Sequence, residues 1–277
     1  MKVMSKFESG VLEFTFQTDG ADLDNIESLN YSMTDEKIFF SLPKEMDYIH
    51  PDLLGLASIL LCNPFVGEEL ALPCPVSRKF FEDASRVISR YRIVETVDDT
   101  LAPIQKEDSA RPCLAFSGGA DSAAALAIMP AITVPVFLNR PMVSSNSYNS
   151  DAPLRICSLL SESGYDVQII ESNLEFIRKP VGFPTDLANS IPAILLSELL
   201  NFDSIGFGTV LESGYGIGHE KYNDYGKGSH WAFYSTIFRS VGLDLCLPTL
   251  GISEVGTAII GKISPIATIG QSCIRGS

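Results

Sequence analysis

The sequence predicts an α/β protein in which a parallel β-sheet is flanked by helices and preceded by a small α+β module. From Arg111 onward, short apolar runs alternate with helical patterns, which is typical of a Rossmann-like parallel sheet. The first hundred residues instead contain segments in which apolar and polar residues alternate, as in a partly exposed sheet. A chain of 277 residues with 45% hydrophobic content can bury one sizeable core and a smaller module.

The N-terminal α+β module is predicted over residues 1–105. Alternation predicts strands at 11–16 and 37–42. Residues 51–61 begin with proline and have apolar spacing suited to a buried helix, and residues 77–90 form a second helix with Ser77 as its N-cap. The polar stretch 98–112 contains two prolines, so we place the domain boundary there.

The second domain is predicted over residues 111–277 and contains the parallel sheet. Its expected strands are residues 114–116, 134–138, 167–170 and 204–208, and its expected helices start at Asp121 or cover residues 153–163 and 185–200. In open sheets of this type, ligands bind beyond the carboxyl ends of the strands. The turn at 117–122 and the other strand ends are therefore expected to share one site.

The turn at 117–122 has the composition of a phosphate-binding loop. Two adjacent glycines allow a tight turn, and the serines and the start of the following helix offer hydrogen bonds and a positive dipole to phosphate oxygens. It is not a Walker A loop, because there is no lysine between Lys106 and Lys179. A Gly-Gly turn can also be an ordinary connection, but Asp121 and the flanking serines favour phosphate binding. The residues expected to bind phosphate here are Ser117, Gly118, Gly119, Asp121 and Ser122.

This segment resembles the Ser-Gly-Gly-x-Asp-Ser signature of the PP-loop ATP pyrophosphatases (adenine nucleotide alpha hydrolase-like), and all five specified positions match. The family includes 7-cyano-7-deazaguanine synthases, tRNA thiolases, asparagine synthetases and GMP synthetases. The resemblance implies a PP-loop/HUP-type fold, Mg²⁺ and ATP as cofactors, and a ligase or transferase activity. It implies adenylation of a small molecule such as a carboxylate, release of pyrophosphate, and attack by an amine, ammonia or sulfur nucleophile.

Two further strand ends carry candidate residues. Asn139 and Arg140 follow the second strand of the predicted sheet. In the PP-loop family this place binds the adenosine, so the resemblance implies that they contact nucleotide or substrate, and a polar loop is an equal alternative. Residues 206–219 intersperse five glycines with polar and aromatic residues. There Gly208 and Thr209 are predicted to bind phosphate or sugar, and Glu212 to hold Mg²⁺ or a substrate amine. A surface connection is the alternative, as it is for residues 222–231, which otherwise form a lid or a substrate wall.

The C-terminal stretch carries a further resemblance to the 7-cyano-7-deazaguanine synthases, in which a cysteine at about the place of Cys273 opens a zinc-binding cluster. The sequence stops at Ser277, and one cysteine cannot complete a four-ligand site. We therefore expect a truncated chain, with a lost metal or substitute cysteines as alternatives. The landmark order, including Ser253 and Glu254, also resembles the ATP-dependent epimerase of a muramoyl-peptide glutamate. Glu254, like Asp121 and Glu212, is predicted to be catalytic.

Composition and charge limit the kinds of binding partner to expect. A formal net charge of −14 without a dense Lys/Arg cluster makes a nucleic acid an unlikely partner, so a small metabolite is expected beside ATP. Six scattered cysteines, the lack of a leader and apolar runs shorter than the ~20 residues of a bilayer span predict a cytoplasmic protein without membrane contact. A homodimer is left open. The alternatives to adenylation are the epimerase and a non-catalytic nucleotide-binding regulatory protein.

Overall fold

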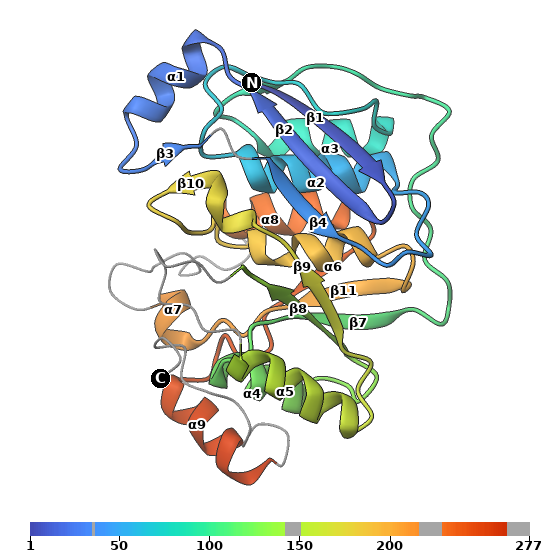
Figure 1. The fold of residues 1–277 in the computed structure, drawn as a ribbon, viewed down its shortest axis with the longest axis vertical. Coiled ribbons are helices and arrows are strands. Elements are labelled where there is room, and N and C mark those ends of the chain that lie inside the picture. Colours follow the sequence, from blue (N-terminus) through green and yellow to red (C-terminus); the bar gives the residue numbers. More distant parts are fainter. Residues whose placement is uncertain (35–36, 142–150, 216–228, 265–277) are drawn as a thin grey trace. The chain divides into compact units, whose positions relative to one another are not determined.

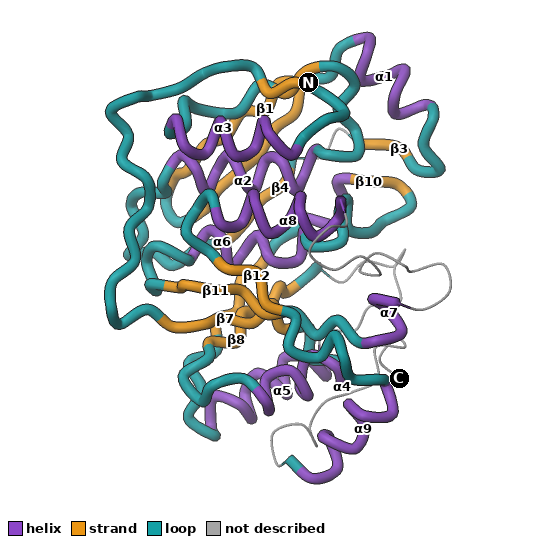
Figure 2. Tube along the Cα trace, turned by 180° about the vertical axis from the view of Figure 1, so that it is seen from behind, coloured by secondary structure: helices purple, strands orange, loops and turns teal. Residues whose placement is uncertain are grey.

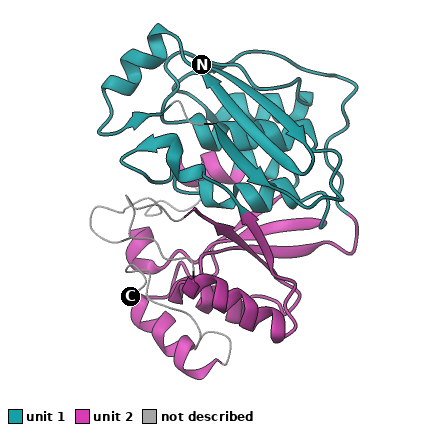
Figure 3. Ribbon diagram, viewed as in Figure 1, with its two compact units in different colours: residues 1–106, 171–200, 236–242 teal, residues 107–170, 201–235, 243–277 magenta. Residues whose placement is uncertain are grey.

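The computed structural model describes residues 1–34, 37–141, 151–215 and 229–264 (Figure 1). The chain divides into two compact units (Figure 3). Unit 1 contains residues 1–106, 171–200 and 236–242, and unit 2 contains residues 107–170, 201–235 and 243–277. Segments 171–200 and 236–242, which we assigned to the second predicted domain, thus belong to unit 1. The predicted domains themselves, 1–105 and 111–277, stay predictions.

Unit 1 contains a three-stranded antiparallel sheet of order β1-β2-β4, formed by β1 (Lys2–Glu8), β2 (Val11–Gln17) and β4 (Ile38–Ser41). Ser9 and Gly10 join the first two strands with φ of 54° and 79°, the positive values that a tight hairpin turn requires. Alternate residues on one face are fully buried, among them Phe14 and Phe40. The alternation read from the sequence therefore marks the buried face of this sheet.

The helices of unit 1 include α1 (Gly20–Glu27), α2 (Pro51–Cys62), α3 (Arg78–Val87) and α6 (Ile191–Leu196). Figures 1 and 2 show α2 and α3 lying against one face of the three-stranded sheet. Nearly every residue of α2 is buried, as its apolar sequence predicts. The remaining elements are short: β3 (Ser32–Met33) paired with β10 (Arg178–Lys179), β5 (Glu69–Leu70) paired with β6 (Arg92–Ile93), and the 3₁₀ helices Leu174–Ile177 and Ala188–Ser190.

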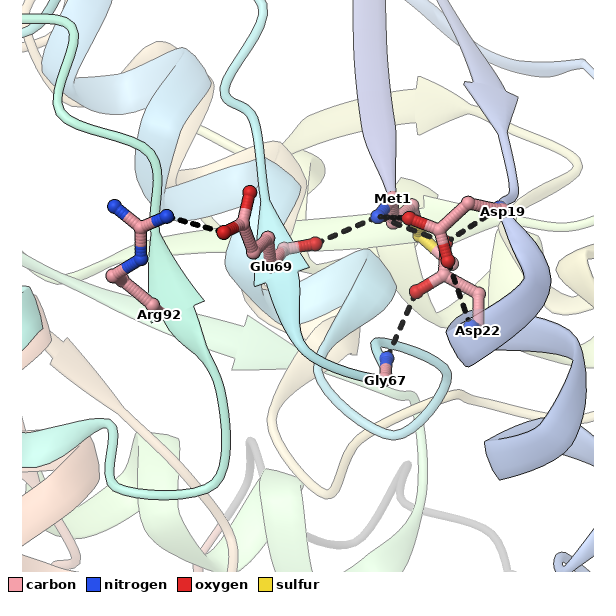
Figure 4. A network of polar contacts seen from close by, with 6 residues as sticks. All are labelled: Met1, Asp19, Asp22, Gly67, Glu69 and Arg92. Carbon is pink, nitrogen blue, oxygen red and sulfur yellow. Dashed lines mark hydrogen bonds and ion pairs between the residues drawn. The ribbon is translucent and has the colours of Figure 1, made fainter.

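A buried carboxylate fixes the start of α1 (Figure 4). Asp22 is fully buried, and its oxygens accept hydrogen bonds from the backbone N–H groups of Gly67 (2.8 Å) and Asp19 (3.0 Å). Asp19 in turn accepts from the N–H of Asp22, which completes a capping box. The amino group of Met1 lies 2.8 Å from Asp22 and donates to the carbonyl of Glu69. Such pairing is what makes a buried charge tolerable.

Unit 2 contains the five-stranded sheet, of order β12-β11-β7-β8-β9. Its strands are β7 (Arg111–Phe116), β8 (Val134–Asn139), β9 (Gln168–Glu171), β11 (Phe202–Gly206) and β12 (Asp244–Cys246). The pairings of β7 with β8, β7 with β11 and β11 with β12 are parallel. The chain moves outward from β7 through β8 to β9 and then crosses to the other side of β7. The predicted α/β class, a Rossmann-like parallel sheet flanked by helices, is confirmed.

Helices α4 (Ala120–Ile128) and α5 (Asp151–Glu162) cover one face of this sheet (Figure 1). Their apolar residues and those of β7 and β8 form one buried cluster that includes Leu114, Phe137 and Leu160. Further helices are α7 (Leu211–Tyr215), α8 (Ser229–Arg239), which contributes residues to both units, and α9 (Glu254–Ile263). Ile260 of α9 packs against the same cluster, so α9 is attached to the core of unit 2.

Several predicted boundaries are wrong. The strand expected over 114–116 begins at Arg111, and the helix expected over 77–90 ends at Val87. The helix expected over 185–200 is a 3₁₀ turn followed by the six-residue α6, which begins at Ile191 with Pro192 in its first turn. The strand expected over 204–208 begins at Phe202, directly after Asn201, whose φ of 49° interrupts the preceding helical turns. We did not predict β1, α1 or β12. Every helix in the described part of the chain is too short or too polar to span a bilayer.

Candidate functional site

The loop between β7 and α4 adopts the tight turn that its glycines predict. Gly118 has a φ of +77°, a region that residues with side chains rarely occupy. A Cβ atom on Gly118 would also lie 3.1 Å from the Cβ of Pro153, in the first turn of α5. Gly119 is extended and buried, and it precedes the first residue of α4. The glycines thus let the backbone turn directly from the end of β7 into the helix.

The serines of this loop hydrogen-bond to the loop itself. Ser122 is buried, and its hydroxyl donates to the carbonyl of Gly119 (2.9 Å) and accepts from the N–H of Ser117 (3.4 Å). The Ser117 and Ser122 hydroxyls lie 3.1 Å apart, and the N–H of Gly119 donates to the Ser117 hydroxyl (3.3 Å). Both serines therefore hold the shape of the turn, a role that the sequence analysis did not include.

The start of α4 has no side-chain cap among the described residues. The first N–H groups of any α-helix lack partners within the helix, and they carry the positive end of its dipole. Gly119 stands at the capping position and has no side-chain oxygen to offer. The backbone N–H groups at the start of α4 are consequently the natural donors for an anionic ligand.

The end of β11 lies directly against the start of α4. A Cβ atom on Gly208 would come within 2.7 Å of the Ser122 nitrogen and 2.8 Å of the Asp121 carbonyl carbon. The direction of chain progression reverses between β7 and β11, and such switch points are where open parallel sheets bind ligands. Neighbouring Thr209 accepts a hydrogen bond at its carbonyl from the Thr249 hydroxyl, 3.0 Å away. Only a glycine fits where Gly208 packs.

The three predicted catalytic acids all contact α9 or belong to it. Asp121, half-buried in the first turn of α4, accepts a hydrogen bond from the hydroxyl of Thr257, 2.7 Å away. Glu212, on α7, accepts from the backbone N–H of Glu254, 3.0 Å away. The Ser253 hydroxyl caps α9 by accepting from the N–H of residue 256. Sequence reasoning missed Thr257, since no local motif marks it.

Asn139 and Arg140 lie at the sheet edge where β7 ends, because β8 runs parallel to β7. Asn139 is the last residue of β8, and Arg140 follows it. The side-chain oxygen of Asn139 is buried and has no hydrogen-bond partner among the described residues. A buried polar atom of this kind usually has a partner, so a ligand is one way to supply it.

No group of three His, Cys, Asp or Glu side chains in the described ranges is placed to hold a metal ion. Cys273 lies outside the described residues, as does most of the predicted lid at 222–231. The five described cysteines form no disulfide with one another. Burial raises the pKa of the Cys157 thiol to about 12 and that of Cys74 to about 11, so both stay protonated at neutral pH and are poor metal ligands.

Comparisons with known proteins find a family model and solved structures that resemble this chain. Residues 233–277 match a family of unknown function (DUF6395). The chain is also similar to the solved structure of the U34-tRNA thiolase NcsA from Methanococcus maripaludis with its [4Fe-4S] cluster, with 16% identity and a TM-score of 0.39. That similarity covers 66% of this chain and 62% of the thiolase chain, less than two thirds of its length. A search of curated proteins gives no match. The likeness to the thiolase is too distant to assign an activity.

Proposed function

We propose that this protein binds Mg-ATP at the start of α4 and adenylates a small-molecule substrate, releasing pyrophosphate. The observation that carries the proposal is the start of α4, which no described side chain caps. It lies at the switch point of a parallel sheet and directly follows the Gly-Gly turn. The match of residues 117–122 to the PP-loop signature supports ATP as the ligand.

Backbone groups would bind the phosphates. The N–H groups at the start of α4 offer donors and a positive dipole, and no side chain of the described residues caps them. Gly118 and Gly119 bring the backbone close to the phosphates, and the Gly119 N–H, which donates to the Ser117 hydroxyl, would turn to the ligand instead. Ser117 and Ser122 keep these donors aligned through their mutual hydrogen bond. Because Gly208 has no side chain, the backbone that precedes Thr209 lies directly against the start of α4. Donors held in fixed positions in this way stabilise developing charge without reorganisation.

Carboxylates near the loop suit Mg²⁺, which prefers oxygen ligands. Asp121 is half-buried beside the phosphate-binding turn, and Glu212 is exposed on α7, so a metal ion could reach either carboxylate. When bound, Mg²⁺ would neutralise charge on the phosphates. Glu254, at the start of α9, extends this acidic surface toward the substrate. A zinc ion at Cys273 would need ligands from outside the described residues.

The nucleoside would be held at the end of β8. The buried oxygen of Asn139, which has no partner among the described residues, can accept a hydrogen bond from an amino or hydroxyl group of adenosine. Arg140, the next residue, offers a positive charge to the phosphates or to an anionic substrate. The parallel pairing of β8 with β7 supports both assignments, because it puts the ends of the two strands at the same side of the sheet.

In the proposed reaction a carboxylate oxygen of the substrate attacks the α-phosphorus of ATP. A new O–P bond forms, the bond to the bridging oxygen of the β-phosphate breaks, and pyrophosphate leaves with that electron pair. The acyl-adenylate then carries AMP as a good leaving group, which an amine, ammonia or a sulfur nucleophile displaces. Positioning and charge stabilisation supply the rate enhancement, since no protein nucleophile is required. Cytoplasmic location, a homodimer and the absence of nucleic-acid and membrane partners stay predictions.

The test combines binding with product analysis for wild type, Asp121→Asn and the control Asp24→Asn, an exposed aspartate on α1. Mg-ATP is titrated calorimetrically, and phosphorus NMR follows AMP and pyrophosphate after incubation with a small-metabolite extract. Both products are expected from wild type and Asp24→Asn and should be lost in Asp121→Asn. Binding without products would favour the regulatory protein, and solvent deuterium entering an amino-acid α-carbon would favour the epimerase. A wild type that does not bind Mg-ATP would disprove the proposal.

A further inference from the structure

We infer that Thr257 is a positioning residue that holds the Asp121 carboxylate in place for Mg-ATP. This inference rests on the function proposed above and adds a residue to it. The two side chains come from helices far apart in the sequence, α4 and α9, and their oxygens lie 2.7 Å apart. Thr257 is 1% exposed, so water cannot replace Asp121 as the partner of its hydroxyl.

The Thr257 hydroxyl has two acceptors and one proton. Its oxygen lies 2.7 Å from Asp121 Oδ1 and 2.9 Å from the carbonyl oxygen of Glu254, one turn earlier in α9. A hydroxyl donates to only one acceptor at a time, and a hydrogen bond to a carboxylate is stronger than one to a neutral carbonyl. The Thr257 hydroxyl therefore donates its hydrogen bond to the Asp121 carboxylate.

The second acceptor makes this contact exchangeable. If a ligand draws charge from Asp121, the hydroxyl can rotate to the Glu254 carbonyl, and no buried donor is left without a partner. Oδ1 is thus restrained without being locked, and Oδ2, which has no hydrogen-bond partner in the described part of the chain, is available to a metal ion. A side chain that could donate only to Asp121 would have to lose that bond outright.

Helix α9 is fixed well enough to act as the support. Ile260, one turn after Thr257, packs against the core cluster of unit 2. At the start of the helix, Ser253 accepts from the N–H of Gly256, and Glu212 accepts from the N–H of Glu254. Both ends of this stretch are therefore anchored, so the position of the Thr257 hydroxyl is set by the fold.

The experiment compares wild type with Thr257→Val, which keeps the shape and removes the hydroxyl, and Thr257→Ser, which keeps the hydroxyl. Calorimetry measures the affinity for ATP with Mg²⁺ and with EDTA. We expect Thr257→Val to weaken Mg-ATP binding about tenfold, to change metal-free ATP binding little, and Thr257→Ser to restore affinity. In an Asp121→Ala background, Thr257→Val should have no further effect.

A purely structural role predicts a different pattern, in which Thr257→Val weakens ATP binding equally with and without Mg²⁺ and also in the Asp121→Ala background. That pattern, or wild-type affinity in Thr257→Val, would overturn the inference while leaving the proposed function intact. If wild type binds no Mg-ATP, both fall together. Circular dichroism checks each variant for folding, and if Thr257→Val does not fold, Thr257→Ala gives the same comparison.

Discussion

The starts of α3 and α4 are built in opposite ways. Ser77 caps α3, and its hydroxyl accepts from the N–H of Phe80 (3.2 Å) while donating to Asp52 (2.7 Å). Asp52 is fully buried and also accepts from the N–H of Ser77 (2.7 Å). The start of α4 follows Gly119 and has no side-chain cap among the described residues.

At the start of α3, side chains of the protein accept hydrogen bonds from the helix N–H groups. At the start of α4, those N–H groups are available to a ligand. At α3, a buried serine and a buried carboxylate satisfy one another, so a ligand would find nothing to bind. At α4, side-chain hydrogen bonds shape the preceding turn, and the described residues provide no side-chain acceptor for the helix start. Substitutions at α3 should therefore change stability without changing ligand binding, whereas those at α4 should change binding first.

The largest effect is expected from Asp52→Ala. It removes the acceptor of two buried hydrogen bonds from Ser77, and unsatisfied buried donors are costly. We expect the free energy of unfolding to fall by about 3 kcal/mol, measured by urea denaturation. The exposed Asp24→Ala is the matched control and should stay within about 0.5 kcal/mol of wild type. Mg-ATP affinity of the folded protein should not change, and a parallel loss of affinity would contradict the contrast between the two helix starts.

Gly208→Ala should affect both properties. The added methyl group would lie 2.7 Å from the Ser122 nitrogen, so the start of α4 must shift. We expect a loss of about 2 kcal/mol in unfolding free energy and at least a tenfold loss of Mg-ATP affinity, roughly 1.4 kcal/mol. Gly251→Ala is the control, because a Cβ atom there meets no atom within 4 Å. Unchanged Mg-ATP affinity in Gly208→Ala would show that the segment after β11 does not contribute to the ATP site.

Ser77→Ala should cost about 2 kcal/mol of stability, since it removes an N-cap and one hydrogen bond to the buried Asp52 but leaves the backbone of α3 intact. Thermal or urea unfolding measures it. Ser158→Ala, which removes an exposed helical serine bonded only to the preceding turn, should be neutral or slightly stabilising. Equal losses in the two variants would show that the cap has no special weight.

The sequence predicted those parts of this contrast that local signals determine. Pro51 and Ser77 marked the starts of their helices, and the Gly-Gly turn marked the passage from β7 to α4. It could not predict which oxygen Ser77 would meet, or that Thr257 would reach Asp121 across 136 positions. Such pairings depend on how α9 packs, and no local periodicity encodes that.

Gly119→Asp, compared with Gly119→Ala, tests the open helix start with the smallest effect on stability. Gly119 has φ of −77° and ψ of 162°, the extended conformation that a capping residue adopts, so neither substitution needs backbone strain. The aspartate should cap α4, and this variant should be about 1 kcal/mol more stable than the alanine variant, which has no side-chain acceptor. Its carboxylate would occupy the N–H groups that phosphate needs and repel the ligand. We therefore expect Gly119→Asp to bind Mg-ATP at least tenfold more weakly than Gly119→Ala, measured by calorimetry. Equal affinities would mean that the start of α4 does not hold the phosphates, because the two variants share a Cβ atom and differ in the acceptor.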